Sequence, residues 1–185
     1  SSMLRQWHYA CGKSETVADT AVPQVKTAAD IVMAAPFEDD PLFSEIMRDY
    51  AMEISSDPAN EWVIMVAHGP EDEPDNVWDT ANLERHAQWL RANTDFDEVL
   101  AINLQDDAPP PVRASNVQKL RAWITVARSR GQEALILSFV TSRGLVGTIT
   151  KDLDGLTYRF NPKGLQQHPN FQTWLAQSVA RATQD

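Results

Sequence analysis

Residues 63–70 read VIMVAHGP: five consecutive apolar residues, Val63 to Ala67, lead directly into a histidine, a glycine and a proline. Two similar apolar runs follow, EVLAINL at 98–104 and ALILSFV at 134–140. Segments with a helical spacing of apolar residues separate the three runs. Strands without a polar face are typical of parallel sheets covered by helices. This order therefore predicts an α/β fold, a mostly parallel sheet with helices on both faces and flavodoxin-like layering.

The remaining segments extend this pattern in both directions. Apolar residues that recur every three to four positions predict helices at 42–54, 79–93, around 117–127, 148–154 and 170–183. Apolar runs predict strands at 31–36, 62–67, 98–104, 134–140 and 156–160. Because proline lacks a backbone N–H, DDAPPP at 106–111 is predicted to be a loop, and TSRGLVG is a second loop.

Composition limits the classes of function. The chain has 185 residues, is 43% hydrophobic and carries a net charge of −10, which disfavours nucleic acid and anionic membrane surfaces as partners. Cys11 is its single cysteine, so neither an internal disulfide nor a thiolate zinc cage is expected. No apolar run approaches the ~20 residues that span a bilayer, and the N-terminus lacks the apolar core of a signal peptide. The expected compartment is the cytoplasm, although a signal peptide removed before residue 1 would leave no trace.

An internal repeat suggests how the chain is divided. Every position of the apolar face of 170–183 lies 128 residues after a position of the face in 42–54, as Pro169 does after Pro41. The repeat predicts that 31–57 is the closing strand and helix of a truncated first unit. A complete second unit would then span 61–185, and the weakly patterned residues 1–30 would form a tail. A chance likeness between two amphipathic helices that follow a proline is the alternative.

The position of His68 suggests a binding site. In parallel sheets, ligands bind beyond the carboxyl ends of the strands, and His68 follows such an end. Gly69 permits a sharp turn, and Pro70 restricts the next φ angle. A neutral imidazole placed there can bind a metal or transfer protons. A histidine that caps the next element or hydrogen-bonds a neighbouring loop is the alternative.

These residues resemble a known family. VIMVAHGPEDEPDN, the two later strands, the TSRGLVG loop and the closing HPNFQTWL are similar to class II chelatases of the sirohydrochlorin cobaltochelatase type, over roughly 31–183. The resemblance implies a chelatase-like fold and a lyase-type reaction of cobalamin biosynthesis, the insertion of a divalent metal into a tetrapyrrole. Co²⁺ is the first expectation, with Ni²⁺ or Fe²⁺ as alternatives and no further cofactor. His68 would be the metal ligand and the acceptor of pyrrole protons. A homodimer, or association with a missing first half, is expected.

The sequence departs from the family pattern in one respect. The family has a second histidine after the glycine of the third-strand loop, but residues 142–153 contain none, and the position falls near Val146. Three explanations remain: the missing first half supplies the chemistry, carboxylates replace the histidine, or the chain is a non-catalytic metal- or tetrapyrrole-binding protein. The carboxylates that could act as weaker metal ligands are those of Glu71, Asp72, Glu73 and Asp75. A solvated loop of like charges is the alternative.

Basic residues matter because tetrapyrroles of this pathway carry many carboxylates, which an acidic rim would repel. Arg113, Arg143 or Lys119 would have to face the crevice, and Gly69 is a further weak candidate for substrate contact.

The remaining histidines receive structural interpretations. His86 is predicted to be a surface or packing residue, and His168 to cap the closing helix or to lie in its loop. His8 falls in the tail.

Overall fold

The computed structural model describes residues 26–29, 31–32, 37, 40–142 and 145–183. The chain divides into two compact units, Phe37–Trp174 and the combination of Ser1–Pro36 with Leu175–Asp185. The first of these units contains the sheet and the site. In the part of the chain that is described, no helix combines the length and apolar composition needed to cross a bilayer.

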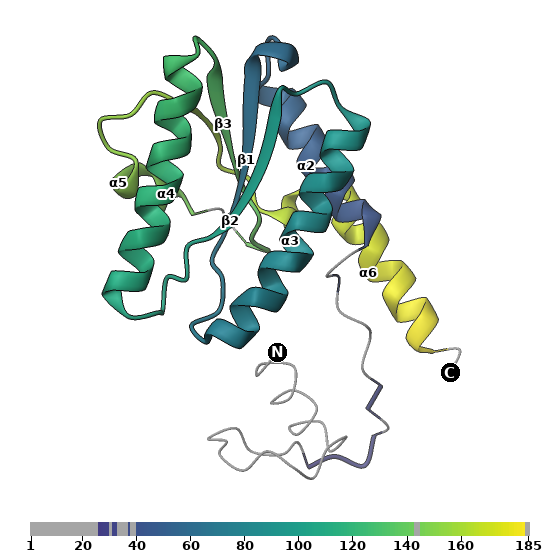
Figure 1. Ribbon diagram of the computed structural model, residues 1–185. Coiled ribbons are helices and arrows are strands. Elements are labelled where there is room, and N and C mark those ends of the chain that lie inside the picture. The colour runs from purple at the N-terminus through teal and green to yellow at the C-terminus, as the bar shows by residue number, and fades with distance from the viewer. Residues whose placement is uncertain (1–25, 30, 33–36, 38–39, 143–144, 184–185) are drawn as a thin grey trace. The chain divides into compact units, whose positions relative to one another are not determined.

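The larger unit is built on four parallel strands (Figure 1). These are β1 (Glu61–Ala67), β2 (Glu98–Asn103), β3 (Glu133–Ser138) and β4 (Arg159–Asn161), in the order β2-β1-β3-β4. Met65 in β1 lies opposite Ala101 in β2 and Leu137 in β3. This is the strand order of flavodoxin-like folds, and it confirms the predicted parallel α/β class.

Helices cover both faces of this sheet, as Figure 1 shows. The covering helices are α2 (Pro41–Ile54), α3 (Glu73–Asn93), α4 (Pro110–Ser129) and α5 (Val146–Asp152), and the last helix along the chain is α6 (Pro169–Ala182). Helices α2 and α3 pack on the face to which Val63 and Met65 point, whereas α4 and α5 cover the face of Ile64 and Val66. Successive strand side chains point to opposite faces. Both faces of β1 are therefore buried, and the apolar run in the sequence is explained.

Proline positions account for the largest errors in the predicted boundaries. Helix α3 begins at Glu73 rather than residue 79, and α4 begins at Pro110, inside the segment that was predicted to be a loop. Proline is well tolerated in the first helical turn, where its missing N–H has no partner to lose. A proline cluster after a strand therefore marked a helix start here and not only a loop.

Other boundaries shift less. Helix α5 begins at Val146 rather than 148, and β4 is confined to Arg159–Asn161 rather than 156–160. Most of the strand predicted at 31–36 lies outside the described residues, and Ile31 and Val32 are not in a strand. The predicted tail 1–30 and its histidine also lie almost entirely outside them.

Two contacts fix the segments that follow β3 and β4. Tyr50 in α2 donates a hydrogen bond from its hydroxyl to the carbonyl oxygen of Gly164 (3.0 Å). Gly164 precedes the short 3-10 helix η2 (Leu165–Gln167), and a Cβ built on it would lie 1.4 Å from the carbonyl oxygen of Ser142. The loop after β3 is therefore packed directly against backbone at this glycine.

At the amino end of β1, next to the short 3-10 helix η1 (Pro58–Asn60), lies the buried carboxylate of Glu61. Its side chain is only 2% exposed. Burial raises the pKa of Glu61, but the hydrogen bonds that it accepts outweigh burial, and its pKa lies below the ordinary value. The donors are Ser55, Ser56 and Asp57, together with Arg159, which forms an ion pair with Glu61 (3.4 Å).

Candidate functional site

The candidate site lies where the strand order reverses. From β1 the chain crosses to β2 on one side, and from β2 it returns to β3 on the other side of β1. Ligands of open α/β sheets bind at such a switch point, beyond the carboxyl ends of the strands. His68 follows β1 directly, and Phe139, which follows β3, donates its backbone N–H to the carbonyl of Val66 (2.8 Å). The predicted position of His68 at this edge agrees with the structure.

The imidazole of His68 is exposed and has a defined orientation. Its side chain is 47% exposed, and Nδ1 lies 3.0 Å from the carbonyl oxygen of Gly69. A carbonyl oxygen can only accept, so a hydrogen bond here requires the proton on Nδ1. The lone pair of a neutral imidazole is then on Nε2. Nε2 lies 3.6 Å from an Asp107 carboxylate oxygen and 4.0 Å from one of Asp106.

Gly69 makes the turn possible in two ways. Its φ is 71°, in the left-handed region that other residues adopt only at a cost. A Cβ on Gly69 would also lie 2.6 Å from the Cβ of Asn103, closer than atoms of this kind approach. The predicted sharp turn is confirmed, and the requirement for glycine also comes from the end of β2.

The loop after β2 braces the histidine turn. The backbone N–H of Asp106 donates to the carbonyl of His68 (3.2 Å), and the side-chain amide of Gln105 donates to the carbonyl of Pro70 (3.3 Å). Gln105 is 3% exposed and has a φ of 54°, which is uncommon for a residue with a side chain. Asn116 in turn donates to the Gln105 side chain (3.0 Å). The His68 turn is therefore held by the backbone of Asp106 and the buried side chain of Gln105, and not by its own loop alone.

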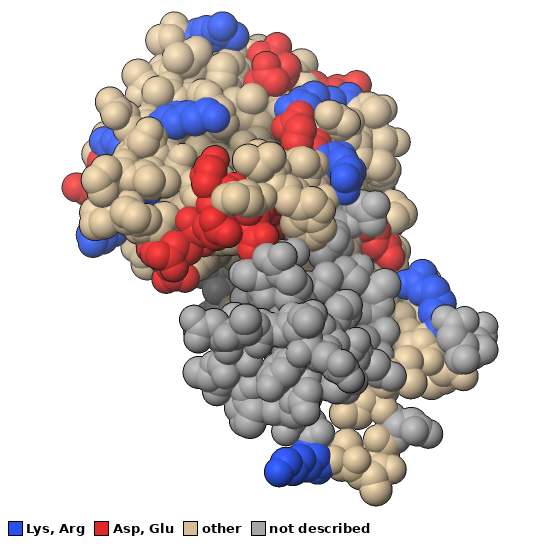
Figure 2. Space-filling model, turned by 60° about the horizontal axis from the view of Figure 1, so that its bottom comes forward, with Lys and Arg blue, Asp and Glu red and all other residues tan. Residues whose placement is uncertain are grey.

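The acidic residues are divided between different environments. Glu71 and Asp72 are exposed, whereas Glu73 and Asp75 lie in the first turn of α3, where negative charge suits the helix dipole. Asp75 is only 8% exposed, so these residues do not form a uniformly solvated loop. Figure 2, which brings the carboxyl edge of the sheet forward, shows acidic side chains gathered on this face.

Sequence reasoning missed the carboxylates nearest to His68. Within the described ranges, the carboxylates at ion-pair distance from His68 belong to Asp106 and Asp107, which follow β2. The signal was present, because the ends of adjacent parallel strands meet at one edge of a sheet. Both residues lie within three positions of the end of a predicted strand, but they were interpreted only as part of a proline-rich loop.

The three basic residues that were expected to face the crevice have different surroundings. Arg113 binds Asp106 (2.9 Å) and Asp152 (2.6 Å), and the hydrogen bond to Asp152 is the main cause that raises the pKa of Arg113. Its charge is therefore already matched by two carboxylates. Lys119 lines a cavity beside β2. Arg143 lies outside the described residues.

His86 is more deeply placed than its helical position suggested. It is 2% exposed, and its Nδ1 lies 2.8 Å from the hydroxyl oxygen of Ser44 in α2. Its ring also contacts Phe139, at 4.9 Å between centroids. The packing alternative is confirmed and the surface alternative is wrong.

A row of polar side chains along one face of α3 explains why His86 is buried. Burial raises the pKa of Asp79, and the neighbouring charge of Asp75 acts in the same direction. Asn82 is also buried, at 5% exposure. A spacing of three and four residues places these side chains on one face of α3 with His86. Polar residues at helical spacing could have indicated that this face of α3 is buried. The sequence analysis considered only apolar residues when it assigned helix faces.

His168 has the capping role expected from the sequence. Its Nδ1 accepts a hydrogen bond from the backbone N–H of Asn170 in the first turn of α6 (3.1 Å). Its Nε2 lies 3.3 Å from Asp49. A role at the end of a helix is thus confirmed for this histidine.

Potential metal ligands are not clustered in the described part of the chain. Among the residues described, no group of three or more histidine, cysteine or acidic side chains is arranged to hold a metal ion. Val146, near which the resemblance places a second histidine, begins α5 and is 42% exposed. A metal ion at His68 would therefore need donors other than a cluster of the described residues.

Fold and site together define an α/β protein of the flavodoxin-like class. No family model matches the chain, and no curated protein sequence matches it. Among solved structures, the chain is similar to "SirB from Bacillus subtilis with Fe3+", with a TM-score of 0.64 and 16% sequence identity. The similarity covers 82% of this chain and 57% of the SirB chain. At this identity, the likeness shows a shared fold.

Proposed function

We propose that this chain binds a sirohydrochlorin-type tetrapyrrole and takes part in the insertion of a divalent metal, with His68 acting at the metal. The observation that carries the proposal is the exposed imidazole at the switch point, with Nδ1 against the carbonyl of Gly69 and Nε2 facing two carboxylates. Fold similarity to SirB, which was solved with Fe³⁺, supports it.

This arrangement suits the chemistry of insertion. Two pyrrole N–H groups lose their protons as one divalent ion enters, so two protons must be accepted for each metal bound. Nε2 of His68 can coordinate the incoming ion or accept one of these protons. Asp106 and Asp107 would stabilise the resulting imidazolium, since each lies within 4.0 Å of Nε2.

A second candidate is a non-catalytic carrier of metal or tetrapyrrole. It is favoured by Val146 at the place of the expected second histidine, and by the shortage of clustered ligands in the described residues. The chain also spans 57% of its structural neighbour, so an activity of the whole neighbour need not reside in this part.

One assay separates the two candidates. The protein is incubated with sirohydrochlorin and Co²⁺, Ni²⁺ or Fe²⁺, and the absorbance of the macrocycle is followed against a buffer control. Faster insertion than the control supports the enzyme. A spectral shift on binding without faster insertion supports the carrier. A macrocycle spectrum that matches the buffer control with every metal would refute both the enzyme and the tetrapyrrole carrier.

Histidine variants test the role of His68. His68→Ala should abolish any acceleration, because it removes the donor at Nε2. His168→Asn is the matched control: it also removes an imidazole, but asparagine can still cap α6. Full activity of His68→Ala would exclude this histidine from the chemistry.

A further inference from the structure

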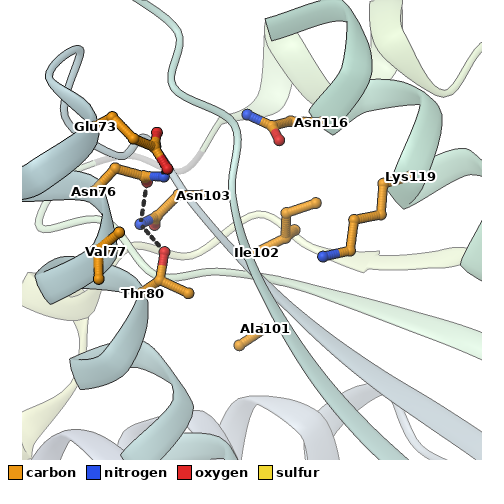
Figure 3. A pocket seen from close by; sticks show the side chains of 9 residues that line it. All are labelled: Glu73, Asn76, Val77, Thr80, Ala101, Ile102, Asn103, Asn116 and Lys119. Carbon is orange, nitrogen blue, oxygen red and sulfur yellow. Dashed lines mark hydrogen bonds between the residues drawn. The ribbon is translucent and has the colours of Figure 1, made fainter. Parts of the chain in front are cut away.

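A polar cavity lies beside the His68 turn, between α3 and α4 (Figure 3). Its volume is about 290 Å³. The polar side chains that line it come from three elements: Glu73, Asn76 and Thr80 in α3, Asn103 in β2, and Asn116 and Lys119 in α4. His68, Asp106 and Asp107, on which the proposed metal chemistry depends, do not line this cavity.

The floor of the cavity is the open edge of the sheet. In the described part of the chain, β2 is an outer strand with a partner on one side only. The N–H of Leu104 donates to Ala67 in β1 (3.0 Å), so by alternation the backbone groups of Ala101 and Asn103 face away from β1. Arg91 confirms this alternation, because its Nε donates to the outward carbonyl of Val99 (2.9 Å). Ala101 and Asn103, unlike Val99, line the cavity.

One buried amide, that of Asn103 in β2, connects the floor of the cavity to the α3 wall. Asn103 is 4% exposed, and its Nδ2 donates to Asn76 Oδ1 and Thr80 Oγ1, each at 3.1 Å. Its Oδ1 is buried without a hydrogen-bond partner among the residues described. Buried polar atoms are rarely left in this state, and those that are often mark a functional site. The amide cluster therefore has hydrogen-bonding capacity that the protein itself does not use.

Opposite charges stand on opposite walls. Figure 3 shows Glu73 reaching in from α3 and the Lys119 ammonium reaching in from α4, with β2 between them. Glu73 accepts hydrogen bonds from Asn76 (3.3 Å) and Gln105 (3.4 Å). Lys119 Nζ lies 5.0 Å from the ring centroid of Trp123, and no carboxylate of the described residues is within ion-pair distance of it. The side chains that line the cavity therefore include one carboxylate and one ammonium, on opposite walls.

We propose that this cavity binds a small zwitterion of amino-acid size. The carboxylate of the ligand would bind Lys119, its ammonium would bind Glu73, and the backbone edge at Ala101 would supply further hydrogen bonds. The volume is close to the lower end of the ~300–1,000 Å³ typical of ligand pockets, so a macrocycle does not fit. A ligand with a single charge would leave the charge of either Glu73 or Lys119 without a partner in the cavity. A simple anion would also be repelled by a chain of net charge −10.

The test compares ligands that differ in one charge. Isotope-labelled protein is titrated with L-alanine, with propionate, which lacks the ammonium, and with ethylamine, which lacks the carboxylate. L-Alanine should shift the side-chain amide resonances of Asn76, Asn103 and Asn116, and it should bind at least about tenfold more tightly than either analogue. Equal affinity of propionate and L-alanine would overturn the proposal, as would the absence of shifts up to about 10 mM L-alanine.

Single-charge variants add a second criterion. Lys119→Gln should weaken L-alanine binding by at least about tenfold but should not weaken ethylamine binding, because ethylamine has no carboxylate for Lys119 to bind. Lys119 is exposed, so folding is not at stake. Lys151→Gln is the matched control, an exposed lysine in α5 outside the cavity, and it should change nothing. Unchanged L-alanine binding by Lys119→Gln would refute the proposed site.

Discussion

Replacing Gly69 by alanine tests the geometry of the histidine turn. The left-handed φ of 71° costs a residue with a side chain about 1–2 kcal/mol. The added Cβ would also meet the Cβ of Asn103 at 2.6 Å, and overpacking of this kind costs about 1–3 kcal/mol. Alanine restricts the unfolded chain, which returns about 0.4–1 kcal/mol. We therefore expect a loss of about 2–4 kcal/mol in the free energy of unfolding.

Gly131 provides a matched control for this experiment. Its φ is +76°, and a Cβ placed on it would have no atom within 4 Å. Gly131→Ala should therefore carry the backbone cost alone, and the two variants should differ by the contact with Asn103, about 1–3 kcal/mol.

Urea denaturation of both variants measures this difference directly, provided that the slopes agree with that of the parent protein. Equal losses for Gly69→Ala and Gly131→Ala, within about 0.5 kcal/mol, would refute the claim that Asn103 crowds the turn.

Two further variants test the connections at the ends of the strands. Gly164→Ala should lower the unfolding free energy by about 3 kcal/mol or more, because its Cβ would lie 1.4 Å from the backbone oxygen of Ser142, and an unchanged denaturation midpoint would contradict this contact. Glu61→Gln should destabilise the protein at neutral pH, because the folded state lowers the pKa of Glu61. The stabilisation from Glu61 is complete above the unfolded pKa of about 4.3 and is lost as pH falls through the lower folded value. The difference between parent and variant should thus shrink from pH ~6 to ~3 in chemical denaturation, and a constant difference would contradict the assignment.

Much of the architecture could be predicted because it depends on local patterns. The apolar run at 63–67 requires a strand buried on both faces, and the alternation of such runs with helical segments requires parallel connections. The glycine after His68 indicated a sharp turn for a similar reason, since conformational freedom is a property of the residue itself. These features depend on a few neighbouring residues, so the order of residues determines them.

The start of α4 shows where local reasoning was ambiguous. Three consecutive prolines at 109–111 exclude a continuing strand, but they are compatible with both a loop and a first helical turn. Packing of Leu120 and Ile124 against the sheet decided in favour of a helix that reaches back to Pro110.

The sequence by itself determined the class of fold, the strand that delivers His68 and the need for a turn at Gly69. Only the tertiary structure decided which charges meet. It placed Asp106 and Asp107 beside the imidazole, paired Arg113 with Asp152, buried His86 against Ser44 and set Lys119 opposite Glu73. The physical reason is that these partners are far apart along the chain or lie on different elements. Their distances depend on strand order and helix packing, which no local pattern encodes.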